Sequence, residues 1–166
     1  MSMMRTAGCL LLSLMWFGCA SASSRLTPRI GDVLEPESGK CSVLITEEPG
    51  VGALDAKLRL GSNTVASVMD VAEIFWTGET LVYSVKPIYG DPGIYVWRCA
   101  SSPPVKIVRP TNFSKAWPQG ADYFRLVGEE NGKLTYEYAP DVDSKSLDGD
   151  LRTNRKTIDL PVSMGR

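Results

Sequence analysis

The sequence predicts a mainly β protein, folded as an antiparallel sandwich with one short helix. Apolar and polar residues alternate with period two in most segments, which is typical of strands that bury one face. An Asn-Gly pair separates two such segments, and this is the strongest short-range signal for a β-hairpin. Hydrophobic residues make up 43% of the chain and charged residues 22%, which is the composition of an ordinary globular domain.

The first 22 residues have the organisation of a secretion signal. Arg5 precedes an apolar stretch from Ala7 to Cys19, which is long enough for the core of a signal and too short to cross a bilayer comfortably. Ala20-Ser21-Ala22 then supplies the small residues of a cleavage site. We therefore expect cleavage after Ala22, so that residues 23–166 fold as a single β-rich domain outside the cytoplasm.

A second interpretation of the same region remains open. Gly18-Cys19-Ala20-Ser21 resembles the end of a bacterial lipobox, in which the cysteine is acylated. The resemblance implies a lipoprotein held at a membrane through Cys19, with a structural or inhibitory role in the envelope. Trp16 departs from the family pattern, which has an aliphatic residue there. Only this anchor would bring the protein to a membrane.

Two cysteines, Cys41 and Cys99, lie beyond the predicted signal. Exported proteins meet an oxidising environment, and two cysteines leave a single intramolecular pairing. We expect a Cys41–Cys99 disulfide, which would close a loop of about 58 residues. The alternative is two free thiols, or thiols paired between molecules.

The period-two segments follow one another along most of the chain. In order they are Ser42–Thr46, 58–60, 81–85, 94–99 and 105–109. In the fourth of these, Tyr95, Trp97 and Cys99 fall on one face of the expected strand, and Ile94 and Val96 fall on the other. We expect each segment to be a strand of the sandwich.

One segment departs from this alternation. Its apolar residues recur at helical spacing: Val65, Val68, Met69, Ala72, Phe75 and Trp76. Ser62 or Asn63 could cap the start of a helix, and Gly78 could end it. The spacing predicts a short helix over residues 64–75, with the β-branched residues of the segment weighing against it.

The C-terminal part begins with the hairpin signal. Tyr123–Val127 and Lys133–Tyr138 alternate and flank Asn131-Gly132, and both turn residues tolerate a positive φ. Residues at about 140–156 are polar and interrupted by Gly and Pro, so they predict a long loop. A last short strand is expected over residues 158–162.

The segment from Leu81 to Cys99 resembles the E–F region of immunoglobulin-like domains. The family pattern ends D-x-G-x-Y-x-C, and Asp91, Gly93 and Tyr95 stand at the matching spacing. Trp97 occupies the position of the family's cysteine, while Cys99 follows two residues later and keeps the same facing. The resemblance implies an immunoglobulin-like sandwich, with Cys41 on its B strand and residues 103–109 as its G strand.

The composition excludes several chemistries. The chain has no histidine, which removes Ser-His-Asp and Cys-His catalysis and histidine-ligated metals. Lys and Arg number 18 against 19 Asp and Glu, so nothing indicates nucleic acid as a partner. The aspartates of residues 141–150 do not match the spacing of a calcium loop. We expect no metal and no cofactor.

The remaining prediction is an exported module that binds a protein partner and is not an enzyme. Aromatic residues on a rigid scaffold offer large contact area at little entropic cost. The candidate contacts are Tyr89, Trp117 and Tyr123. Asn112-Phe113-Ser114 is an acceptor site for N-glycosylation if the chain passes through a eukaryotic secretory pathway. A small hydrolase that works with a pair of carboxylates remains a further alternative.

Overall fold

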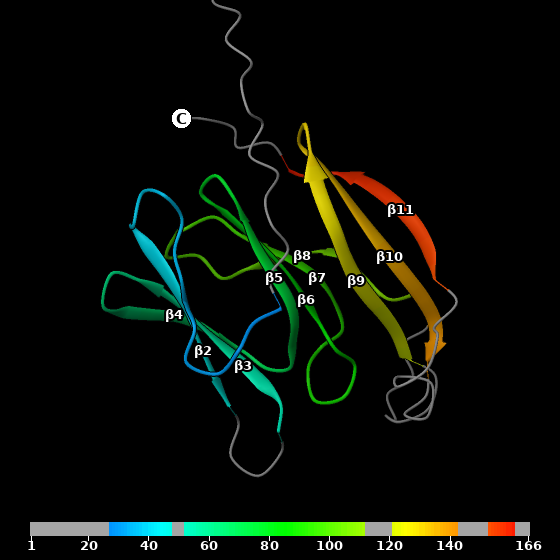
Figure 1. Cartoon of the computed structure of the whole chain (residues 1–166), viewed down its shortest axis with the longest axis horizontal. Coiled ribbons are helices and arrows are strands. Elements are labelled where there is room, and N and C mark those ends of the chain that lie inside the picture. The colour runs from blue at the N-terminus through cyan, green and yellow to red at the C-terminus, as the bar shows by residue number, and fades with distance from the viewer. Residues whose placement is uncertain (1–26, 48–51, 112–120, 143–152, 162–166) are drawn as a thin grey trace, which may run out of the picture.

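The chain folds into antiparallel β-sheets, as Figure 1 shows. The structure is a computed structural model that describes residues 27–47, 52–111, 121–142 and 153–161. These residues form three antiparallel sheets and contain no helix. The prediction of a mainly β sandwich is therefore confirmed.

Each sheet is a meander in which consecutive strands pair. The first sheet has the order β1-β2-β3-β4, with strands Val33–Leu34, Cys41–Glu47, Leu54–Leu60 and Asn63–Val68. The central sheet has the order β5-β6-β7-β8, with strands Val71–Thr77, Thr80–Val85, Gly93–Trp97 and Val105–Val108. The third sheet has the order β11-β10-β9, with β9 at Ala121–Glu130, β10 at Lys133–Val142 and β11 at Asn154–Asp159.

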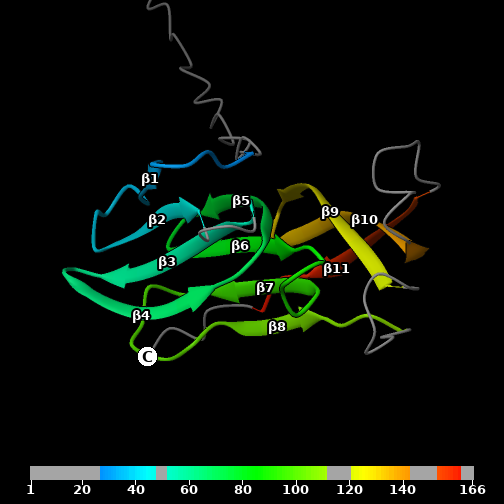
Figure 2. The same cartoon turned by 90° about the horizontal axis from the view of Figure 1, so that it is seen from below.

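The central sheet lies between the other two, and its two faces contribute to separate cores (Figure 2). One core joins the first and central sheets through residues such as Val43, Leu58 and Tyr83. The other joins the central and third sheets through residues such as Val82 and Phe124. Because both faces are covered, five consecutive residues of β6 are buried. This explains why that strand is apolar almost throughout rather than on one face alone.

The predicted helix over residues 64–75 is wrong. β4 ends at Val68, and the chain turns at Met69 and Asp70 before β5 begins in the central sheet. Asp70 has a φ of 59°, the left-handed conformation that lets the chain turn so sharply. The first five residues of β5 are all buried. A strand with apolar residues on both faces also matches a helical template, which explains the error.

The predicted hairpin is present between β9 and β10. Asn131 and Gly132 have φ values of 54° and 76°, as a two-residue turn of this kind requires. The carboxylate of Glu129 accepts a hydrogen bond from the backbone N–H of Gly132 at 2.6 Å. The carbonyl of Gly132 in turn accepts the N–H of Leu160 at 2.7 Å, so the turn is held from both sides.

The C-terminal strands are longer than the sequence suggested. β10 continues to Val142 and β11 begins at Asn154, so both ends of the polar segment predicted at about 140–156 are strand. Residues 143–152 lie outside the described residues. The last strand spans Asn154–Asp159 instead of residues 158–162. No described segment forms a helix with the length and hydrophobicity that crossing a membrane requires.

The predicted Cys41–Cys99 disulfide is present, with the two Cα atoms 5.5 Å apart. Cys41 begins β2 in the first sheet, and Cys99 follows β7 of the central sheet. The bond therefore links the first sheet covalently to the central sheet. The predicted signal over residues 1–22, including Cys19, lies outside the described residues, as do Asn112 and Trp117.

Candidate functional site

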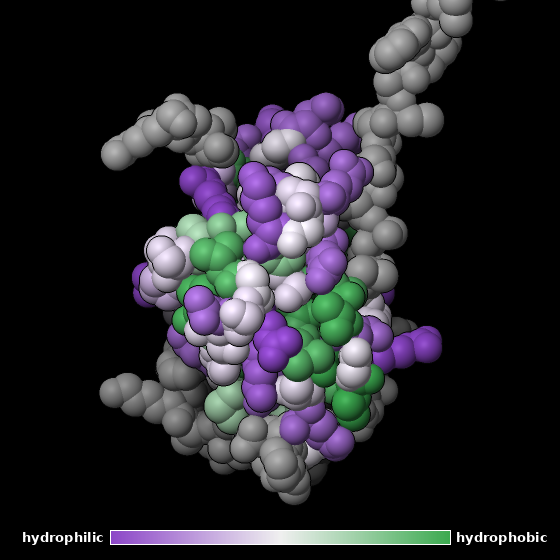
Figure 3. Space-filling view, turned by 90° about the vertical axis from the view of Figure 1, so that its left-hand side faces the viewer, coloured by the Kyte–Doolittle hydropathy of each residue, from purple (hydrophilic) through white to green (hydrophobic). Residues whose placement is uncertain are grey.

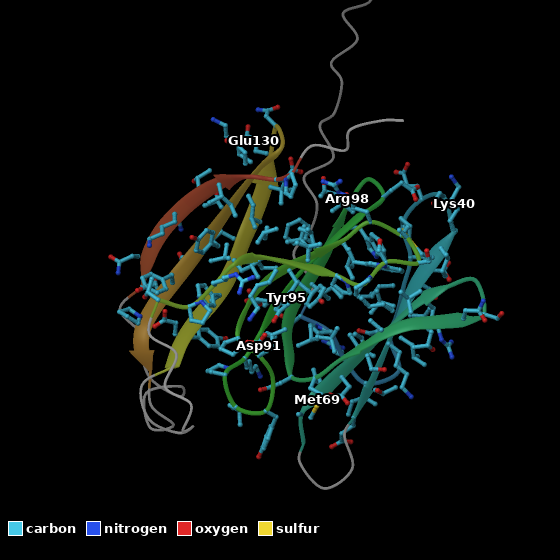
Figure 4. All side chains as sticks on the ribbon, turned by 180° about the vertical axis from the view of Figure 1, so that it is seen from behind. Lys40, Met69, Asp91, Tyr95, Arg98 and Glu130 are labelled. Atoms are coloured by element: carbon cyan, nitrogen blue, oxygen red, sulfur yellow. A yellow bond between two sulfur atoms is a disulfide. The ribbon has the colours of Figure 1, made fainter. Side chains whose placement is uncertain are left out.

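The candidate site is an apolar pocket of about 320 Å³ between β4 and the central sheet. We call it the tyrosine pocket. It is lined by Ala66, Ser67, Val68, Met69, Tyr83, Val85, Tyr89, Gly90, Asp91, Tyr95 and Pro104. Its wall thus combines one end of β4, the turn into β5, the loop between β6 and β7, and two strands of the central sheet. Figure 4 shows Met69, Asp91 and Tyr95 on this side of the molecule.

The floor of the pocket consists of two stacked phenol rings. Tyr83 on β6 and Tyr95 on β7 face each other across the strand pair, with ring centroids 5.2 Å apart and planes at 4°. Tyr83 is only 1% exposed, and this burial is the main cause that raises the pKa of its phenol. The neighbouring Tyr95 raises the pKa further. Two closely packed aromatic rings without charge therefore line the floor.

Polar groups at one side of the pocket hold Tyr95 in place. Its hydroxyl donates to Asp91, reaching the backbone carbonyl at 2.8 Å and the carboxylate at 3.0 Å. Lys106 pairs with the other carboxylate oxygen of Asp91 at 2.5 Å, and its ammonium lies 5.1 Å from the centre of the Tyr95 ring. Burial is the main cause that raises the pKa of Tyr95, and the Asp91 charge adds to it. A neutral Tyr95 is thereby fixed in one orientation.

The turn into β5 positions the rim. The Asp70 carboxylate is buried and accepts the backbone N–H of Tyr89 at 3.1 Å, while the Asp70 carbonyl accepts the N–H of Lys86 at 2.9 Å. Gly90 packs directly against this turn, where a Cβ would stand 2.6 Å from the carbonyl oxygen of Met69. Only glycine allows this close approach. The loop before β7 is thus anchored to the turn.

The rim carries two exposed apolar side chains. Tyr89 is 51% exposed and Met69 is 43% exposed, and both line the pocket. The structure therefore places the predicted contact Tyr89 at the site. It does not bring Tyr123 there, because Tyr123 lies half-buried on β9 of the third sheet. The sequence did not indicate Met69 as a contact, because its spacing placed it among the apolar residues of the predicted helix over 64–75.

A second pocket of about 350 Å³ lies at the other end of β5. Four glutamates line it together with Trp76: Glu35, Glu37, Glu79 and Glu129. Glu129 is already engaged, since its carboxylate accepts hydrogen bonds from the Thr77 hydroxyl at 3.0 Å and from the Gly132 N–H. We call this the glutamate pocket.

Glu79 also lies beside the disulfide. One of its carboxylate oxygens and the sulfur atoms of Cys41 and Cys99 are all within 4.8 Å of one another. Such spacing would suit a metal ion if all three groups were free. Both sulfurs are bonded to each other, so Glu79 is the one donor that this cluster offers in the oxidised protein.

Comparison of the chain with protein-family models, with curated proteins and with solved structures finds no match. The hydrogen bond from the Tyr95 hydroxyl to a carbonyl four residues earlier has the form of the tyrosine corner of immunoglobulin-like domains. The described sheets, by contrast, are meanders, whereas that family connects its strands as a Greek key. The resemblance stays a prediction.

Proposed function

We propose that the protein is an extracytoplasmic binding module that holds an apolar side chain of a partner polypeptide in the tyrosine pocket. The observation that carries the proposal is that the exposed Met69 and Tyr89 line the same pocket as the stacked rings of Tyr83 and Tyr95. Apolar walls with a few fixed polar groups are the usual construction of a recognition pocket.

The size of the pocket supports a side chain as its occupant. Pockets for drug-sized molecules range from about 300 to about 1,000 Å³, and the tyrosine pocket is near the lower end. One large aliphatic or aromatic side chain fits such a space. Buried aromatic and apolar anchors of this kind dominate the affinity of many protein interfaces.

The disulfide supports an extracytoplasmic location. A bond between Cys41 and Cys99 indicates an oxidising environment such as the exterior of the cell, the secretory pathway or the periplasm. Export through the predicted signal at residues 1–22 would bring the chain there. A lipid anchor on Cys19 would do the same while keeping the module at a membrane.

Titration with side-chain analogues tests the pocket. With the methionine methyl groups labelled, N-acetyl-tryptophan amide and N-acetyl-leucine amide should shift the Met69 methyl resonance, and N-acetyl-aspartate amide should not. The Y89A variant should weaken the effect, whereas I30A removes a side chain that is 59% exposed outside the pocket and should leave it unchanged. The proposal would be contradicted if the analogues shifted other methionine resonances but not that of Met69, or if they caused no shift at all.

A second candidate function follows from the glutamate pocket. Glycoside hydrolysis uses two carboxyl groups on either side of the scissile bond, and Trp76 offers an aromatic surface beside Glu35, Glu37 and Glu79. We propose it as the alternative activity. Assay of nitrophenyl glycosides should then show turnover that E79Q abolishes, and absence of turnover with the wild-type protein would reject it.

A further inference from the structure

The outer edge of β4 borders the tyrosine pocket. β4 pairs with β3 on one side, and no other strand in the described parts of the chain pairs with its opposite edge. Outward N–H and C=O groups of such an edge repeat at the spacing of a β-ladder, and another strand is their natural complement. Figure 3 views the molecule from the side of β2–β4, where apolar side chains form patches between hydrophilic ones.

β4 lacks two of the features that normally protect an edge, although a register shift at Val65 interrupts its ladder with β3. Proteins blunt free edges with charged residues or by keeping the strand very short. The other outer strands among the described residues follow this rule, since β1 has two residues and β5, β8, β9 and β11 each contain charged ones. β4 spans six residues, Asn63–Val68, without any charge. Among the described strands, β4 is therefore the outer strand of more than two residues without charge, and its regular stretch 66–68 borders the tyrosine pocket.

We propose that β4 receives an extended segment of a partner protein as an added strand of the first sheet, with one bulky apolar side chain of the segment in the tyrosine pocket. Ala66, Ser67 and Val68 belong both to β4 and to the pocket wall. An added strand would lie about 4.8 Å from β4 and send alternate side chains to each face. Main-chain hydrogen bonds would supply affinity, and the pocket would supply specificity.

The chemistry of the pocket defines this partner. A second copy of the chain could offer β4 itself, but its side chains are no larger than Val and would leave a pocket of about 320 Å³ largely empty. The occupant is therefore a different sequence with a residue such as Leu, Met, Phe or Trp. At the rim, the Asp91 side chain is 69% exposed while that of its partner Lys106 is 12% exposed. The carboxylate is thus the more exposed member of this ion pair, and an acidic flanking residue would meet it before it met the ammonium.

This inference rests on the proposed function and is tested with synthetic peptides. The probes are short extended peptides of alternating Thr and Val, with Lys at each end and a central guest residue that is Leu, Trp or Ala. Fluorescence anisotropy should show binding of the Leu and Trp peptides that is at least tenfold tighter than binding of the Ala peptide. Hydrogen exchange should show new protection at β4 amides when a peptide binds.

Backbone methylation separates strand addition from pocket binding alone. N-methylation of alternate residues on one edge of the Leu peptide should weaken binding at least tenfold, and methylation on the other edge should leave it nearly unchanged. Strand addition would be overturned if both methylated peptides bound equally well and bulky guest residues were still preferred. The proposed function of the pocket would then still stand. Failure of all the peptides to bind would overturn strand addition as well. Strand addition by a partner protein would also be overturned if the free protein were a homodimer whose β4 amides are already protected from hydrogen exchange.

A variant of the edge gives the complementary control. T64K places a charge on an exposed residue of β4 that does not line the pocket. It should weaken binding of the Leu peptide to the edge. N-acetyl-leucine amide should still shift the Met69 methyl resonance as it does in the wild-type protein. T157K makes the same exchange on β11, an outer strand of the third sheet, and should affect neither measurement. Equal peptide affinity of T64K and wild type would contradict the proposal.

Discussion

The buried carboxylate of Glu73 on β5 accepts the backbone N–H of Leu126 on β9, which joins the central sheet to the third sheet. Leu126 lies next to a register shift in the pairing of β9 with β10. Arg125 beside it approaches the same carboxylate at 3.7 Å, although half of its side chain is exposed. A side chain from one layer therefore satisfies a main-chain group of another.

We expect E73A to lower the free energy of unfolding by about 2–4 kcal/mol, because it leaves a buried N–H without its acceptor. E73Q keeps an acceptor at the same place and should lose less than about 1 kcal/mol, since the contribution of the exposed Arg125 is small. Urea denaturation measures both values. Equal losses in the two variants would show that the charge, not the acceptor, matters.

Alkaline pH should destabilise the fold through Tyr83. Burial raises its pKa above the ordinary value of 10.0, so at higher pH the unfolded chain loses the phenol proton while the folded chain keeps it. Stability is therefore fully present below pH 10 and should fall above it by about 1.4 kcal/mol per pH unit for this residue. Y83F should reduce the slope of stability against pH, and Y89F, at an exposed tyrosine, serves as the control. Parallel slopes for Y83F and wild type would refute the assignment.

The hairpin turn should depend on Gly132. Its φ of 76° disfavours any residue with a Cβ, so G132A should cost about 1–2 kcal/mol. Gly128 on the same strand pair has open space around its Cα and no positive φ, so G128A should be neutral or slightly stabilising. Thermal unfolding of the two variants compares them directly. A loss at position 128 as large as that at 132 would mean that the turn conformation is not the cause.

The Cys41–Cys99 bond should contribute about 4 kcal/mol to the free energy of unfolding, because it restricts the unfolded chain. The C41A/C99A variant should lose about that amount in urea denaturation.

The Glu79 carboxylate should protect the disulfide from reduction. It repels an attacking thiolate because it lies within 4.8 Å of both sulfurs. E79Q should therefore accelerate reduction by dithiothreitol roughly two- to fourfold. E47Q removes a charge at the opposite end of β2 and should not change the rate. Identical rates for E79Q and wild type would rule out electrostatic protection.

The first residue of the protein after expression tests the predicted signal and its lipoprotein alternative. Mass spectrometry of the protein from its native host should find Ser23 as the first residue if the predicted signal is cleaved after Ala22. A chain that begins at Cys19 with attached acyl groups would support the lipoprotein alternative. Retention of residues 1–22 would contradict both interpretations.

Much of the fold could be predicted because it is local. Period two along β2 follows from the geometry of a strand, and the Asn131-Gly132 turn follows from the φ values that these residues tolerate. The helix over residues 64–75 failed for a non-local reason. β5 is apolar on both faces because two different sheets cover it, and a short apolar run of this kind fits a buried strand and a buried helix equally well.

The sequence by itself determined the strand-rich class and the hairpin, because both depend on neighbouring residues. It also determined the pairing of Cys41 with Cys99, because two cysteines beyond the predicted signal allow one intramolecular disulfide. Only the tertiary structure decided that three sheets stack and that Met69, Tyr89 and Tyr95 meet around one pocket. These residues come from different turns and strands. Their proximity results from the packing of whole sheets, which depends on the sum of many weak contacts rather than on any local pattern.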